Sequence, residues 1–178
     1  MKKETKAQAA LEFLTTYGWA FLVILVMISA LAYFGILKPS RLLPDRCNFG
    51  TELECQDYMI DATANTLTIR LKNNIGEAVQ IQDAADIAVS SESATPVTCA
   101  LAGITDSGGA QPLPAAGSPY TWDGGSVVDF DLDTCTYSVA GIVTGDKGKV
   151  DITITYNKVK SGGTYEHDVI GEIYSTVK

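Results

Sequence analysis

The sequence predicts an α+β protein, in which a long N-terminal hydrophobic α-helix is followed by an antiparallel β-sandwich or open-barrel head domain. Residues 13–37 contain no charged side chain, and no long amphipathic helical pattern follows residue 46. Several later segments instead alternate apolar and polar residues with the two-residue period of a strand. We therefore expect a leader over 1–7, a hydrophobic helix over 8–37, a proline-containing connector over 38–46 and a β-rich head over 47–178.

The hydrophobic segment is long enough to span a bilayer. A helix rises about 1.5 Å per residue, so the run from Phe13 to Leu37 exceeds the roughly 30 Å of a hydrocarbon core. A secretory signal peptide has an apolar region of only about 7 to 15 residues and then a small-residue cleavage site, so it fits this run poorly. Basic residues Lys2, Lys3 and Lys6 precede the run, which by the positive-inside rule predicts a cytoplasmic N-terminus and an exported head.

The expected head is acidic. Six of the 13 basic residues lie at or before Arg46, whereas eighteen of the 21 acidic residues follow it. Nucleic-acid binding needs clustered Lys and Arg to displace phosphate counterions, so the head has no charge pattern for that function.

All four cysteines, Cys47, Cys55, Cys99 and Cys135, follow the hydrophobic segment, and the chain has a single histidine. This composition argues against a zinc site, and an even set of cysteines behind a membrane-targeting segment indicates two disulfides. Three connectivities are possible. We favour Cys47–Cys55, which closes a short acidic loop, together with Cys99–Cys135, which joins the flanks of a long insertion. Disulfides place the head outside the cytoplasm.

Strand patterns begin after Pro39 and Pro44, which end the helix and form a short connector. Residues 66–72 alternate apolar and polar side chains, residues 73–76 read as a turn, and the rhythm continues through 79–81 and 87–89. Residues 90–126 are rich in Ala, Gly, Ser, Thr and Pro, which predicts a long surface loop.

The clearest strands come last in the chain. Residues 127–133 place Val128, Phe130 and Leu132 on one face and three aspartates on the other. Residues 149–157 alternate in the same way, and residues 164–177 return after a Ser-Gly-Gly turn, which predicts a β-hairpin.

The N-terminal stretch QAALEFLTTYGWA resembles the class III signal peptide of archaeal type IV pilins and pilin-like proteins. A prepilin peptidase cuts such peptides on the cytoplasmic side, immediately before the hydrophobic helix. The resemblance implies that Lys6 and Ala7 precede the cut, that Gln8 becomes the first mature residue and that Glu12 is the fifth. It covers roughly the first 37 residues, and Glu4 with Thr5 departs slightly from the basic leader of the family.

Cleavage there leaves the helix attached to the head, so its apolar surface must be buried in lipid or against copies of itself. Small side chains allow packed helices to approach closely, and the segment carries Ala9, Ala10, Gly18, Ala20, Ser29, Ala30 and Ala32. The resemblance implies that Glu12 pairs with the α-amino group of Gln8 on an adjacent subunit and sets axial register. The alternative is an interfacial acid with no such role, because a carboxylate near the membrane interface is tolerated more easily than one at its centre.

Three other groups in the head have competing interpretations. Asp129, Asp131 and Asp133 suggest a calcium site, but they lack the glycine and glutamate of an EF-hand loop, so a solvated strand face is favoured. His167 has acidic neighbours but no nucleophile motif, which argues against an enzyme. Trp122 and Tyr120 form either an adhesive tip or a cap on the sheet, and we favour the cap.

The resemblance implies a structural subunit of an archaeal type IV pilus-like surface filament that serves adhesion or surface attachment, with no cofactor and no metal. Expected partners are copies of itself, the prepilin peptidase, the pilus assembly platform and its ATPase. The chain would be a single-pass membrane protein before assembly and part of an extracellular filament afterwards. The alternatives are a monomeric membrane-anchored exported surface or binding protein, a minor pilin, a pilus-like accessory subunit and an archaeal flagellum subunit.

Overall fold

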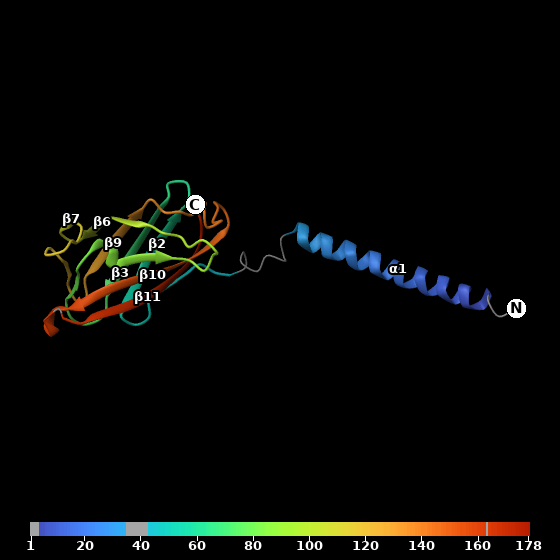
Figure 1. Ribbon diagram of the computed structural model, residues 1–178, viewed down its shortest axis with the longest axis horizontal. Coiled ribbons are helices and arrows are strands. Elements are labelled where there is room, and N and C mark those ends of the chain that lie inside the picture. Colours follow the sequence, from blue (N-terminus) through green and yellow to red (C-terminus); the bar gives the residue numbers. More distant parts are fainter. Residues whose placement is uncertain (1–3, 35–42, 163) are drawn as a thin grey trace. The chain divides into compact units, whose positions relative to one another are not determined.

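The computed structural model describes residues 4–34, 43–162 and 164–178 (Figure 1). The chain divides into two compact units, Met1–Leu43 and Pro44–Lys178. The first unit contains helix α1 (Glu4–Tyr33) and the second contains the β-rich head. This confirms the predicted class, an N-terminal apolar helix followed by antiparallel sheets.

Helix α1 forms because its sequence is dominated by good helix formers such as Ala, Leu and Met and contains no proline. It begins at Glu4, within the expected leader, and its last helical residue is Tyr33. The predicted end of the helix at Leu37 lies outside the described residues, as do Pro39 and most of the connector.

Within the described residues, the head forms a six-stranded and a five-stranded sheet, and every strand pair is antiparallel. The first sheet runs in the order β1 (Arg46–Asn48), β11 (Glu166–Thr176), β10 (Lys147–Lys158), β4 (Val79–Ile81), β8 (Tyr120–Trp122), and β5 (Ile87–Ser90) pairs with β10 beside β4. The second sheet runs in the order β2 (Leu53–Asp61), β3 (Thr66–Asn73), β9 (Val127–Asp133), β6 (Ala100–Asp106), β7 (Gly109–Gln111).

One hydrophobic core lies between the two sheets, as in a β-sandwich. The inward side chains of β3, β9 and β10 alternate with outward ones as the sequence pattern predicts. Phe130, Tyr137 and Ile152 are each 0 % exposed, and Trp122 packs edge-on against Phe130 with ring centroids 5.4 Å apart. The head therefore has a hydrophobic core of its own, formed by its two sheets.

The last two strands form the predicted hairpin, which is the longest in the head (Figure 1). Strands β10 and β11 pair from Lys147 opposite Thr176 to Asn157 opposite Glu166. The short 3-10 helix η3 (Val159–Ser161) and then Gly162, with φ +75°, lead into the turn, and this left-handed conformation favours glycine.

The prediction of one long surface loop over 90–126 is wrong. Strands β6, β7 and β8 lie inside this range, and Tyr120 and Trp122 of β8 are 8 % and 1 % exposed. The same burial rules out an adhesive tip at these two residues. Their apolar surface belongs to the core, so packing overrides a composition rich in Ala, Gly, Ser and Pro.

The expected acidic loop between Cys47 and Cys55 also contains more structure than predicted. Cys47 lies in β1 and Cys55 in β2, and between them Phe49 and Leu53 are each 1 % exposed.

A further 3-10 helix, η2 (Ala84–Asp86), is capped by Asp83, whose carboxylate accepts the Ala85 N–H at 2.9 Å.

Candidate functional site

The apolar surface of α1 is the most unusual feature of the chain. The segment Leu11–Tyr33 has 23 residues, a mean hydropathy of 2.0 and no buried part, so it is long and apolar enough to cross a membrane. Large side chains are exposed on every side of the helix, including Leu14 at 69 % and Trp19 at 68 %. A helix that is apolar all round must be surrounded by lipid or protein.

Within Leu11–Tyr33 the carboxylate of Glu12 is the only charged side chain. The hydroxyls of Thr15 and Ser29 donate hydrogen bonds to the carbonyl oxygens of Leu11 and Leu25, at 2.9 and 2.7 Å. These polar groups are therefore satisfied inside the helix, whereas the Glu12 carboxylate needs a donor from outside it in any dry environment.

Several of the predicted packing residues share one face of α1. Ser29 lies eleven residues after Gly18, about three turns of helix, and Ala32 lies three residues after Ser29, about one turn. The three residues therefore lie on the same side of the helix. A side chain added at Gly18 would meet nothing within 4 Å, so the helix surface there is open. Ala20 and Ala30 lie on other faces of the same helix.

The residues around the expected cleavage site have only their backbone described. Lys6, Ala7 and Gln8 lie in α1, as do Ala9 and Ala10, but their side chains lie outside the described part of the structure. The processing site and these two packing residues stay predictions.

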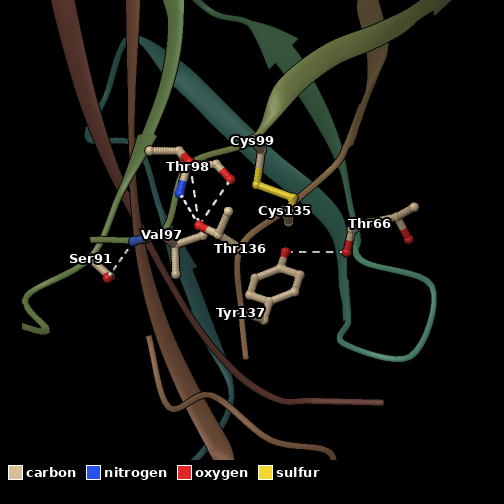
Figure 2. The surroundings of a disulfide bond; sticks show 8 residues. All are labelled: Thr66, Ser91, Val97, Thr98, Cys99, Cys135, Thr136 and Tyr137. Carbon is tan, nitrogen blue, oxygen red and sulfur yellow. Dashed lines mark hydrogen bonds between the residues drawn. A yellow bond between two sulfur atoms is a disulfide. The ribbon is translucent and has the colours of Figure 1, made fainter. Parts of the chain in front are cut away.

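The two disulfides of the head follow the favoured pairing. Cys47 is bonded to Cys55 and Cys99 to Cys135, and among the described residues no cysteine is free. Figure 2 shows the second bridge at the point where Thr136 and Thr98 exchange hydrogen bonds, including Thr136 N to Thr98 O at 3.0 Å. Nearby, the hydroxyl of Tyr137 donates to the Thr66 carbonyl at 3.2 Å. The first bridge joins two strands, β1 and β2, and the second joins the segment before β6 to the segment after β9.

The aspartates of β9 form part of a paired, outward-facing surface. Arg70 donates two hydrogen bonds to Asp129, at 2.6 and 2.7 Å, and Thr68 donates to Asp131 at 3.1 Å. The hydrogen bond to Asp129 raises the pKa of Arg70 above its usual value. Among the described residues there is no group of three or more His, Cys, Asp or Glu side chains arranged to hold a metal ion.

His167 stacks on the buried ring of Tyr156, with centroids 5.5 Å apart. Burial, and after it the negative charges of Glu52 and Glu77, raises the pKa of Tyr156 to about 12. At neutral pH the Tyr156 phenol therefore stays protonated. The stacked rings of His167 and Tyr156 are ordinary packing at the edge of the core.

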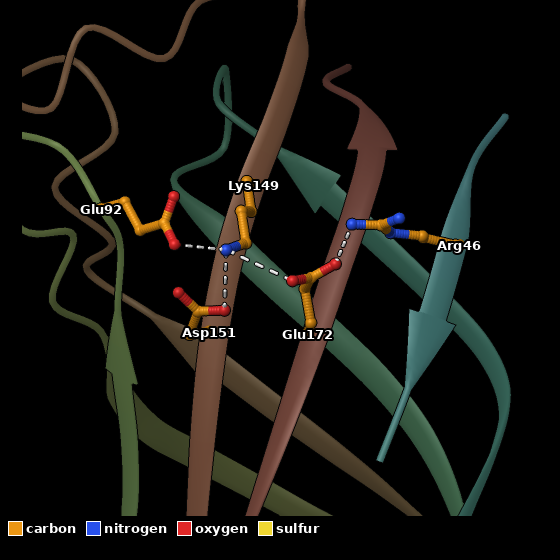
Figure 3. Close-up of polar contacts among 5 residues, drawn as sticks. All are labelled: Arg46, Glu92, Lys149, Asp151 and Glu172. Carbon is orange, nitrogen blue, oxygen red and sulfur yellow. Dashed lines mark hydrogen bonds and ion pairs between the residues drawn. The ribbon is translucent and has the colours of Figure 1, made fainter. Parts of the chain in front are cut away.

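Sequence reasoning missed a charged network on the outer face of the first sheet. Lys149 lies 2.8 Å from Glu92, 3.2 Å from Glu172 and 3.7 Å from Asp151, and Glu172 also pairs with Arg46 (Figure 3). The hydrogen bond to Glu92 is the main cause that raises the pKa of Lys149. The charges were visible in the alternating strand pattern, but their pairing depends on strand order, which the sequence does not state.

In comparisons with known proteins, no family model matches the chain and no curated protein is significantly similar to it.

Proposed function

We propose that this protein is a structural subunit of an archaeal type IV pilus-like surface filament, assembled through α1. The observation that carries the proposal is the apolar surface of α1, exposed on every side and interrupted only by Glu12. Adhesion or surface attachment through many copies is the activity that suits such a subunit.

The apolar surface of α1 can be covered by lipid or by copies of the same helix. Its 23-residue apolar part extends roughly 35 Å as a helix, enough for a hydrocarbon core of about 30 Å. In a filament, copies of the helix replace lipid as the surroundings, and the face with Gly18, Ser29 and Ala32 supports close packing between helices. The acidic, disulfide-bonded head remains in solvent and forms the outer surface.

Glu12 would then set the register of the subunits. Once the leader is removed after Ala7, Gln8 carries a free α-amino group, and a carboxylate in a dry helix bundle is stable only when it is paired. Pairing of Glu12 with Gln8 of an adjacent copy satisfies both charges and fixes one axial offset.

The proposal implies a defined route to the surface. The protein enters the membrane through α1, a prepilin peptidase removes residues 1–7, and an assembly platform with its ATPase transfers the subunit into the filament. The chain is thus a single-pass membrane protein before assembly and an extracellular one afterwards.

The direct test of processing is mass spectrometry of the N-terminus of the protein isolated from its host. A chain that starts at Gln8 supports the proposal, and an intact Met1 or a cut after the apolar run contradicts it. A chain that starts at Gln8 but stays in the detergent-soluble membrane fraction would favour the monomeric anchored surface protein. Processed but scarce copies within filaments of another subunit would favour a minor pilin.

A second test concerns Glu12. We expect Glu12→Ala to be processed and inserted normally but to lower filament yield by at least about tenfold, the effect of roughly 1.4 kcal/mol per contact. Thr16→Ala, one turn further along the same face, is the matched control and should leave the yield unchanged. Filaments of wild-type abundance from Glu12→Ala would exclude the register role.

A further inference from the structure

The head receives the chain from α1 through a short strap, residues 44–53, which crosses from the first sheet to the second. Strand β1 makes three paired positions with β11, from Arg46 opposite Tyr174 to Asn48 opposite Glu172. The chain then turns at Gly50, whose N–H donates to the Asn48 side chain at 3.0 Å, and enters β2 at Leu53. Any tension carried along the chain from α1 reaches the head through this strap.

Ion pairs hold the first part of the strap to the outer face of the first sheet, and Figure 3 shows the one between Arg46 and Glu172. Asp45 pairs with Lys147 and accepts the Thr176 N–H at 3.1 Å, and Arg46 pairs with Glu172. The side chains of Arg46 and Asp45 are 59 % and 45 % exposed, whereas that of Lys147 is 13 % exposed. Ion pairs that water reaches contribute little and are screened by salt. The ion pairs align the strap but cannot resist a sustained pull.

The middle of the strap is part of the core. Phe49 is 1 % exposed, and a Cβ atom placed on Gly171 of β11 would lie 2.2 Å from its ring. The ring therefore occupies the space that the missing side chain of Gly171 leaves. If tension peeled β1 from β11, Phe49 would leave next, and the core between the sheets would open to solvent.

The Cys47–Cys55 disulfide lies where it would prevent this stepwise opening of the core. It joins β1 of the first sheet to β2 of the second, on either side of Phe49. A pull that reaches Cys47 passes through the bridge to Cys55, in a nine-residue strand paired with β3. Residues 48–54 lie outside that path.

We propose that the Cys47–Cys55 bridge is a tension bypass, which carries force from the N-terminal segment directly into the second sheet and keeps Phe49 in the core. This role applies whether α1 lies in lipid or in a filament, so it is independent of the function proposed above. An extended chain spans about 3.4 Å per residue, and the bridged residues are 8 apart in sequence and 6.0 Å apart between Cα atoms. The bridge thus holds back roughly 20 Å of chain.

Single-molecule force spectroscopy of the full chain in detergent micelles tests the proposal. Handles are attached through azide-bearing residues at Leu43, just before the strap, and at Lys160, in the β10–β11 turn. We expect the Cys47→Ser/Cys55→Ser variant to show an early, low-force lengthening of roughly 20 Å that the oxidised wild type lacks.

The other disulfide supplies the matched control. Cys99→Ser/Cys135→Ser should unfold at lower force but without the early lengthening, because its Cys47–Cys55 bridge is intact. Dithiothreitol added to that variant should then produce the step, and this arm covers a Cys47→Ser/Cys55→Ser protein that fails to fold. The same early step in oxidised wild type, or its absence after reduction, would overturn the proposal.

Discussion

Helix α1 exposes its apolar side chains, whereas the head buries most of its own between two sheets. Two tryptophans show the contrast. Trp19 in α1 is 68 % exposed, whereas Trp122 in β8 is 1 % exposed and packs against Phe130. The head is complete as a folding unit because its two sheets cover each other. The helix has no such cover within the described chain, so its stability and its role depend on what surrounds it.

The largest expected effect comes from exchanging this pair of tryptophans for alanine. Trp122→Ala leaves a cavity in the core and should lower the head's free energy of unfolding by about 3–5 kcal/mol. Trp19→Ala should change it by less than about 0.5 kcal/mol. Urea unfolding of the full chain in detergent, followed by near-ultraviolet circular dichroism, measures both. If both variants lowered the free energy of unfolding equally, Trp19 would contribute to the stability of the head as Trp122 does, and the contrast between the two regions would be wrong.

Next in size are the two disulfides, which constrain only the head. On a chain-entropy model, loss of Cys99–Cys135, with 36 residues of separation, should cost roughly 4 kcal/mol. Loss of Cys47–Cys55, with 8 residues of separation, should cost roughly 2.5 kcal/mol. The paired serine variants can be compared by the same urea unfolding. If loss of Cys47–Cys55 cost more than loss of Cys99–Cys135, the burial of Phe49 would depend on the Cys47–Cys55 bridge more than loop length predicts.

A smaller effect is expected where the strap enters the core. Gly171→Ala forces the added Cβ against the Phe49 ring, at 2.2 Å, and should destabilise the head by about 1–3 kcal/mol through overpacking. Gly103→Ala is the matched control, because its Cβ would lie 3.6 Å from the nearest atom of Asp131, an ordinary contact. Thermal melting of both variants distinguishes close packing at Gly171 from a general preference for glycine in strands.

The smallest effect concerns acid. The hydrogen bond from Lys147 lowers the pKa of Asp45, and for Glu172 burial raises the pKa but hydrogen bonds from Lys149 and Arg46 lower it by more. A carboxyl with a lowered folded-state pKa stabilises the fold above its unfolded value, about 4, and this stability is lost as the pH falls through the folded value.

We therefore expect the head to lose stability as the pH falls below about 4, and Asp45→Asn to remove part of that dependence. Urea unfolding at a series of pH values measures the slope. An unchanged slope in Asp45→Asn would show that the pair with Lys147 does not contribute to acid sensitivity.

The sequence pattern predicted the strands whose side chains alternate without interruption. In β9 and β10 one face is buried between the sheets, so period-two alternation survives in the sequence. Strand β6 was missed because Gly103 and a register shift between Leu101 and Gly103 interrupt its pattern. Strands β7 and β8 have three residues each and lie in a stretch rich in Ala, Gly, Ser, Thr and Pro, so a composition typical of loops obscured them.

The same limit applies to the candidate functional residues. The apolar segment and Glu12 could be found from the sequence because their signal is local and continuous. The pairing of Arg46 with Glu172 could not, because 126 positions separate them and only strand order brings β1 beside β11. The close contact between Phe49 and Gly171 also depends on strand order, so it could not be found from the sequence either.

The most direct test of the central claim, that copies of α1 replace lipid as its surroundings, is electron cryo-microscopy of filaments sheared from the host cells. The account predicts filaments whose core consists of α1 helices starting at Gln8, with the disulfide-bonded heads outside. It would be contradicted if the processed protein were found only as a monomer in membranes, with α1 surrounded by lipid and no filament containing it.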